Sequence, residues 1–397
     1  MPSLPTTKLN PSLSLPKLSV PSLGGMPSLK RSGGRGRAGN VVGLDIEPGY
    51  VSAVQAHVNG RVVAERAAGL ELPPDTMREG EVRDADALTQ TLQELFDGSG
   101  LPRQVRVGVA NQRTVLRTME LPPLEDRKEL AAAVRFQAQE EVPMPLDNAI
   151  LDFHSLGIHE TVSGPRQQIV LVAAQRDMIK RLLTAVRAAG LQVHGVDLSA
   201  FALIRSLYRP VENGADAGPQ EGGEAVDSGP ARVLYLNVDG LTNMAIAEGD
   251  VCRFTRVVGG GLEAMAGHLA ERLTIPVVDA RTQIAAVDLS IPEVEGERPD
   301  EARLVLASGV REIAGEVRNS LDFHRSQDGG GEVAQVVLSG AALDIPGFAD
   351  AFQAELGVPV TPETVGASAR AGEGNGDRVS PRRLAVAAGL AVEEAPR

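Results

Sequence analysis

Two segments far apart in the chain end an apolar run with an acid or its amide and continue into a polar turn. The runs cover 42–46 and 233–237, and the residues of interest are Asp45, Gly49, Asn237, Asp239, Gly240 and Thr242. If two such hairpins face each other across a cleft, their backbone N–H groups can hold phosphates from both sides. A carboxylate at a strand end can hold Mg²⁺ through water, so Asp45 is the candidate metal residue. The pattern predicts a nucleotide-binding site.

Three consecutive glycines stand directly before a helical pattern in the second part of the chain. They are Gly259, Gly260 and Gly261, and apolar residues recur at helical spacing over 262–273. Backbone amides at a helix N-terminus carry partial positive charge and favour anions. A plain loop is the alternative for so short a motif. We expect the glycine run to add an anion-binding group to the site.

Each hairpin forms the first turn of a β-meander, and the strands of that meander must position the hairpin. Residues 42–63 and 233–254 each read as strand, polar turn, strand, second turn and strand. Asp45 and Asn237 occupy the same place in the two meanders, which is a weak internal repeat. Two similar halves of this kind are typical of a duplicated nucleotide-binding architecture. A chance likeness between two meanders is the alternative.

Strand-length and helix-length patterns alternate through the rest of the chain. Apolar runs of strand length cover 105–109, 168–173 and 336–338, and helical periodicity covers 126–141, 177–189, 262–273 and 300–327. Alternation of this kind favours an α/β fold.

Composition excludes several classes of protein. The 397 residues carry a net charge of −13, contain 3 % aromatic residues and lack Trp, which disfavours nucleic-acid binding. Cys252 is the only cysteine, so an intramolecular disulfide or a cysteine-clustered metal site is impossible. The absence of a disulfide is consistent with a reducing cytoplasm. No apolar run approaches the roughly 18 residues of a membrane span, so membrane attachment would require a partner.

Composition also divides the chain. Residues 1–40 repeat Pro-Ser-Leu and carry six basic residues without an acid, which predicts a disordered basic tail. The first half of the fold is expected at 41–205, with an inserted subdomain at about 112–175. A glycine-rich acidic loop follows at 206–231, and the second half is expected at 232–392.

In this order and spacing, several segments resemble the PilM family, the actin-like proteins of type IV pilus assembly, and more distantly FtsA. The segments are 43–46, 121–130, 142–146, 152–153, 256–261, 316–323, 338–342 and 346–348. The resemblance covers about 41–392. Within it, Ser339 and Gly340 match the motif that the family places beside adenosine.

The resemblance implies two actin-like halves around a nucleotide cleft, with an extra subdomain inserted in the first half. It also implies ATP with Mg²⁺ in the cleft. An N-terminal peptide of an inner-membrane PilN-type protein would dock beside the inserted subdomain. The protein would then be a cytoplasmic scaffold at the inner face of the membrane, assembled as a homo-oligomeric ring.

The chain departs from the family pattern at its phosphate motifs. Glu47 adds a negative charge, Pro48 lacks an N–H donor, and the position that usually holds Lys has no cation. Asn237 replaces an acid, and Ala341 replaces a glycine. These changes predict weak nucleotide binding and, at most, a slow ATPase.

Two other functions share the expected superfold. A sugar or carboxylate kinase would need a catalytic base and a substrate pocket, for which we find no motif. An FtsA-like polymerising protein usually ends in an amphipathic membrane helix, which residues 392–397 do not resemble.

Overall fold

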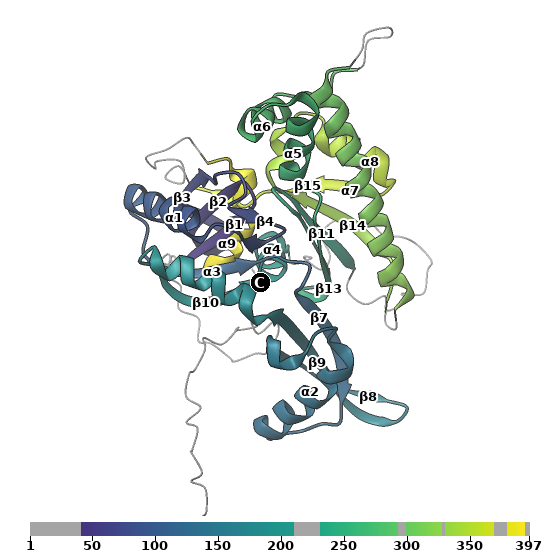
Figure 1. Cartoon of the computed structure of the whole chain (residues 1–397). Helices are drawn as coiled ribbons and strands as arrows, with labels where there is room; N and C mark the ends of the chain where they lie inside the picture. Colours follow the sequence, from purple (N-terminus) through teal and green to yellow (C-terminus); the bar gives the residue numbers. More distant parts are fainter. Residues whose placement is uncertain (1–40, 210–230, 293–298, 328–329, 369–378, 394–397) are drawn as a thin grey trace, which may run out of the picture.

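A computed structural model describes residues 41–209, 231–292, 299–327, 330–368 and 379–393 (Figure 1). The expected basic tail and nearly all of the expected acidic loop lie outside the described residues. The described chain folds into two large sheets with helices packed against them, a three-stranded sheet and a two-stranded hairpin, which confirms the α/β class.

The first large sheet has the strand order β10-β6-β1-β2-β3-β16. The strands are β1 (Val42–Glu47), β2 (Tyr50–Asn59), β3 (Arg61–Glu71), β6 (Gln104–Val109), β10 (Gln192–Leu198) and β16 (Gly366–Ala367). The first three form an antiparallel meander, and β6 and β10 continue the sheet parallel to β1. A short hairpin of β4 (Met77–Arg78) and β5 (Glu81–Val82) follows the meander.

The second large sheet repeats this topology. Its order is β13-β12-β11-β14-β15, with β11 (Arg232–Val238), β12 (Thr242–Glu248), β13 (Val251–Val258), β14 (Val333–Ser339) and β15 (Val360–Pro362). Here too the first three strands form an antiparallel meander, and the last two run parallel to β11. Five strands therefore match between the sheets in order and direction, which is the duplication that the two meanders predicted.

Helices fill the space around and between the two sheets. In the first half, α1 (Ala85–Ser99) and α3 (Arg176–Ala188) cover one face. In the second half, the covering helices are α5 (Leu262–Leu273), α6 (Val277–Ala285), α7 (Glu301–Ser326) and α8 (Phe348–Leu356). Between the halves lie α4 (Ser199–Leu207) and α9 (Ala385–Ala391), in an apolar cluster that includes residues of both sheets.

The end of the chain, which falls within the range 232–392 expected for the second half, returns to the first half. Strand β16 pairs with β3, and α9 packs against β1. All seven residues of α9 are buried, because a helix that is apolar on every side needs a neighbour on every side. Gly43 permits the close approach, since a Cβ at this position would lie 1.8 Å from the carbonyl oxygen of Ala387.

A separate three-stranded sheet projects from the first half (Figure 1). It contains β7 (Val115–Leu121), β8 (Ala149–Thr161) and β9 (Gly164–Gln175) in the order β7-β9-β8, with α2 (Arg127–Glu141) between β7 and β8 in the chain. Its small core packs Leu130 and Val134 of α2 against Ile169 and Leu171 of β9. None of the described helices of the protein combines the length and apolar character that a membrane span needs.

Candidate functional site

The two hairpin tips that were expected to hold phosphates are in contact with each other. The backbone N–H of Leu241 donates a hydrogen bond of 3.2 Å to Oε2 of Glu47. The tips also touch through Pro48, because a Cβ at Gly240 would lie 2.0 Å from the carbonyl oxygen of Pro48. Each tip follows the central strand of its sheet, so the shared topology places them opposite one another.

A second polar network joins the ends of β11 and β14. Nδ2 of Asn237 donates to Oδ2 of Asp239 at 3.0 Å, and Oγ of Ser339 donates to Oδ1 of Asn237 at 2.9 Å. The backbone N–H of Ala341 donates to Oδ1 of Asp239 at 2.9 Å. Because β11 and β14 are parallel neighbours, their carboxyl ends lie at the same edge of the sheet. Asn237 and Asp239, the two candidate residues at the end of β11, are therefore held in place by hydrogen bonds.

Three carboxyl groups are buried at this junction. Burial, together with the charge of Asp239, raises the pKa of Asp45 from 3.8 to about 7. Burial and the charges of Asp45 and Asp239 raise the pKa of Glu47 well above its usual range, against the opposing effects of the Leu241 N–H and Arg383. Burial also raises the pKa of Asp239. The buried surroundings at the hairpin contact therefore favour the protonated form of Asp45, Glu47 and Asp239.

The glycines that were expected at the site have different surroundings in the structure. Gly49 and Gly340 adopt left-handed backbone conformations, with φ of +85° and +104°. Gly261 packs against the second hairpin, where a Cβ would lie 2.5 Å from the carbonyl oxygen of Gly240. Gly259, Gly260 and Gly261 all line a different and larger cavity. The glycine run therefore belongs to the wall of that cavity, and its last residue also contacts the second hairpin.

The expected anion-binding amide at the start of α5 has an internal partner. The backbone N–H of Leu262 donates to the carbonyl oxygen of Asp239 at 2.8 Å. Thr242 is fully buried in β12, and its Oγ1 has no hydrogen-bond partner among the described residues.

A cavity of about 420 Å³ lies beside the hairpin contact. Gly49 and Tyr50 of the first hairpin, Asp239 and Gly240 of the second, and residues of α6 line it together with Arg383. Its size is within the range of small-molecule pockets. The guanidinium of Arg383 lies 4.4 Å from the centre of the Tyr50 ring. Arg281, which also lines the cavity, is held by two hydrogen bonds to Glu263.

A nucleotide fits this site only in part. The cavity beside the tips has the volume of a small-molecule pocket and a cationic side chain, Arg383, in its wall. The touching tips leave no room between Pro48 and Gly240 for further phosphates and a metal ion. Among the described residues, no group of three His, Cys, Asp or Glu side chains is arranged to hold a metal ion.

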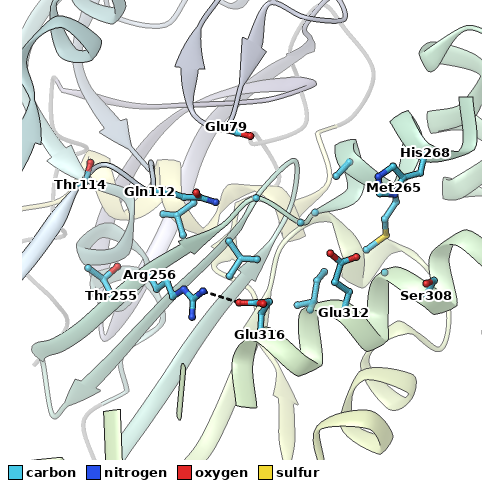
Figure 2. Close-up of a pocket in the computed structure, with 18 of the residues that line it drawn as sticks. Glu79, Gln112, Thr114, Thr255, Arg256, Met265, His268, Ser308, Glu312 and Glu316 are labelled. Carbon is cyan, nitrogen blue, oxygen red and sulfur yellow. Dashed lines mark hydrogen bonds and ion pairs between the residues drawn. The ribbon is translucent and has the colours of Figure 1, made fainter. Parts of the chain in front are cut away.

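The larger cavity, of about 970 Å³, lies between the projecting subdomain and the second half (Figure 2). Thr114 and Arg117 line it from the side of β7, and Thr255 and Arg256 line it from β13. Apolar residues of the second half contribute to its wall, namely Val258, Met265, Val305 and Ile313. Arg256 and Glu316 form an ion pair of 2.8 Å within it.

A model of the family described as type IV pilus assembly protein PilM matches residues 43–395. The chain belongs to this family. Among solved structures, it is similar to the PilM–PilN type IV pilus biogenesis complex at 22 % identity, with a TM-score of 0.68 over 89 % of this chain and 97 % of that chain. This similarity confirms the expected actin-like fold.

Two more distant structures also match the chain. One is the ethanolamine utilization protein EutJ from Carboxydothermus hydrogenoformans, at 16 % identity and a TM-score of 0.46, with 88 % of each chain covered. The other is MreB 5 of Spiroplasma citri bound to AMPPNP, at 10 % identity and a TM-score of 0.44, with 88 % of this chain and 94 % of that chain covered.

Sequence reasoning missed part of the site of this PilM-family chain. Tyr50, Arg281 and Arg383 were not among the expected site residues, although all three line the smaller cavity. Arg383 lies more than 300 residues from Tyr50 in the chain, and no local motif marks it. Glu47 was noticed only as an added charge, whereas its hydrogen bond to Leu241 joins the two halves.

Proposed function

We propose that this PilM-family protein is a type IV pilus assembly scaffold that captures the N-terminal peptide of an inner-membrane PilN-type protein. Capture would place the protein at the inner face of the membrane through its partner. The observation that carries the proposal is the large cavity beside the inserted subdomain of a chain that belongs to this family. The solved relative is itself a PilM–PilN complex.

The cavity has the features that an extended peptide requires. Strands β7 and β13 both line it, and each is the edge strand of its sheet. An edge strand has backbone N–H and C=O groups on one side that can pair with an added strand. The apolar wall formed by residues such as Met265 and Val305 can take alternate side chains of the peptide. The charged residues Arg256 and Glu316 can contact its polar groups.

A single short peptide buries little surface, so its affinity for one copy of the scaffold should be micromolar or somewhat better. A homo-oligomeric ring would bind several membrane-tethered copies at once and gain effective concentration. We further propose weak ATP binding that begins in the smaller cavity and requires the hairpin tips to separate, with Asp45 contributing to any Mg²⁺ then held through water. The contact between the hairpin tips argues against tight binding of the triphosphate.

The experiment is a titration of the full chain with a synthetic peptide from the cytoplasmic N-terminus of the PilN-type protein of the same genome. Ser308 is an exposed residue of α7 that lines the cavity. The change Ser308→Trp fills part of the cavity and should weaken peptide binding by at least about tenfold, a loss of roughly 1.4 kcal/mol. Asn319→Trp is the matched control, because Asn319 is exposed on the same helix outside the cavity.

Failure of the wild-type protein to bind the peptide would contradict the proposed function. Equal binding by Ser308→Trp and the wild-type protein would place the docking surface elsewhere. Replacement of residues 112–175 by a short linker then tests the whole inserted subdomain, with circular dichroism as the check that the shortened chain folds.

A further inference from the structure

Glu47 joins the two halves at the point where the sequence predicted phosphate binding. Its Oε2 accepts a hydrogen bond from the backbone N–H of Leu241, at the tip of the second hairpin. The side chain is 4 % exposed, and its other oxygen, Oε1, is buried without a hydrogen-bond partner among the described residues. The carboxyl group of Glu47 therefore occupies the position from which a phosphate oxygen would contact this amide.

The space left beside the hairpin contact limits the ligand. The cavity of about 420 Å³ begins at Gly49 and Gly240 and extends toward α6 and Arg383. The cavity contains Arg383, which can pair with one anionic group of a ligand. The other arginine in its wall, Arg281, already donates two hydrogen bonds to Glu263. A ligand with one or two phosphates can lie entirely within it. A triphosphate would have to extend between tips that touch each other.

We propose that Glu47 is an internal substitute for the terminal phosphates, so that the closed protein binds nucleoside mono- or diphosphates and excludes triphosphates. The inference rests on the nucleotide binding in the proposed function and names the ligand class that the site prefers. Arg383, held over Tyr50, is the group that contacts the ligand phosphate. Binding of a triphosphate requires Glu47 to leave the amide of Leu241, and the two hairpins then separate.

Two variants of Glu47 test whether its hydrogen bond to Leu241 excludes the terminal phosphates. Glu47→Ala removes the hydrogen bond, whereas Glu47→Gln keeps a side-chain oxygen that can accept from Leu241. Glu94→Ala is the control, because Glu94 is exposed on α1 and does not line the cavity. Each full-length protein is titrated with AMP, ADP and ATP by calorimetry, with and without Mg²⁺.

We expect the wild-type protein and Glu94→Ala to bind ADP or AMP more tightly than ATP. Glu47→Ala frees the amide of Leu241 for a phosphate oxygen and removes a contact between the tips, so it should raise ATP affinity by at least about tenfold. ADP affinity should change less, and Glu47→Gln should lie between the two. Preference of the wild-type protein for ATP, equal ATP affinity in Glu47→Ala, or no binding of any nucleotide would overturn the proposal.

The hydrogen-exchange rate of the Leu241 amide tests its hydrogen bond to Glu47 without any ligand. The amide should be protected in the wild-type protein and in Glu47→Gln, and it should exchange at least about tenfold faster in Glu47→Ala. Unchanged exchange in a folded Glu47→Ala protein would overturn the proposed role of Glu47. Peptide capture tests the scaffold function separately, because the larger cavity does not include Glu47 or Leu241.

Discussion

Nε of Arg205 in α4 donates a hydrogen bond of 3.1 Å to the carbonyl oxygen of Gly389 in α9, 184 residues further along the chain. Arg205 is fully buried and also forms an ion pair with Asp197 at the end of β10. Arg106 of β6 donates to the carbonyl oxygens of Leu390 and Val392, at 2.9 Å each. Two arginines of the first half therefore satisfy the carbonyl groups at the end of the last helix.

Replacing Arg205 with Ala should destabilise the protein by about 3–5 kcal/mol, because Asp197 is then left as an unpaired buried charge. Urea denaturation measures the free energy of unfolding. Arg209→Ala is the control, since Arg209 is partly exposed and its ion pair with Glu363 should contribute less than about 1 kcal/mol. An equal effect of the two changes would contradict the importance of the buried pair.

Gly43→Ala and Gly267→Ala should change stability in opposite directions. A Cβ at Gly43 meets the backbone of α9, so the substitution must displace that helix and should cost more than about 3 kcal/mol. Gly267 lies within α5 with open space around its Cα. Ala at this position should stabilise by about 0.5–1 kcal/mol, because Ala loses less conformational entropy in a helix. Thermal unfolding of both variants checks the two signs.

The free energy of unfolding should fall as the pH rises from about 4 to 7. Between these values the folded protein keeps the proton of Asp45, whose pKa is about 7, while the unfolded chain has lost it. The folded state then binds more protons than the unfolded state, so the slope is negative, at up to about 1.4 kcal/mol per pH unit for one proton. Glu47, whose pKa is also raised, acts in the same direction.

Asp45→Asn isolates the contribution of Asp45 to the pH dependence of the free energy of unfolding, because an amide does not titrate in this pH range. Denaturation of both proteins at several pH values gives the difference between their slopes. The variant should lose less stability than the wild-type protein on going from pH 5 to pH 7. Parallel pH profiles would contradict the raised pKa of Asp45.

Cys252 should react slowly with thiol reagents in the folded protein. Its side chain is 2 % exposed, and burial raises its pKa to about 12, so the reactive thiolate is scarce at pH 8. Labelling with iodoacetamide should therefore follow the unfolding of the second sheet. An exposed cysteine from Ser308→Cys, in a Cys252→Ala background, provides the fast control. Rapid labelling of folded wild-type protein would contradict the buried environment.

The repeated pattern of the sequence was enough to predict much of the fold. The helix expected at 262–273 is α5, and that expected at 126–141 is α2 with Asp126 as its N-cap. These elements combine clear periodicity with local end signals, so the information lies within a short stretch of chain. Strand β8, by contrast, was missed because its half-exposed residues give little periodic contrast.

The arrangement of distant segments could not be predicted in this way. Short apolar runs such as 385–391 indicate burial without indicating which half provides the neighbours. The same limit applies to the site, where Arg383 reaches Tyr50 only after the end of the chain has folded back onto the first half. The hydrogen bond from Leu241 to Glu47 likewise depends on how closely the halves approach, which no local pattern encodes.

The return of the chain to the first half restricts how the two halves can move. The chain passes from α4 to β11, and comes back where β16 pairs with β3. Translation of one half away from the other would break the β16 pairing and expose α9. We therefore expect any separation of the hairpin tips to be a rotation that keeps β16 paired with β3 and α9 buried.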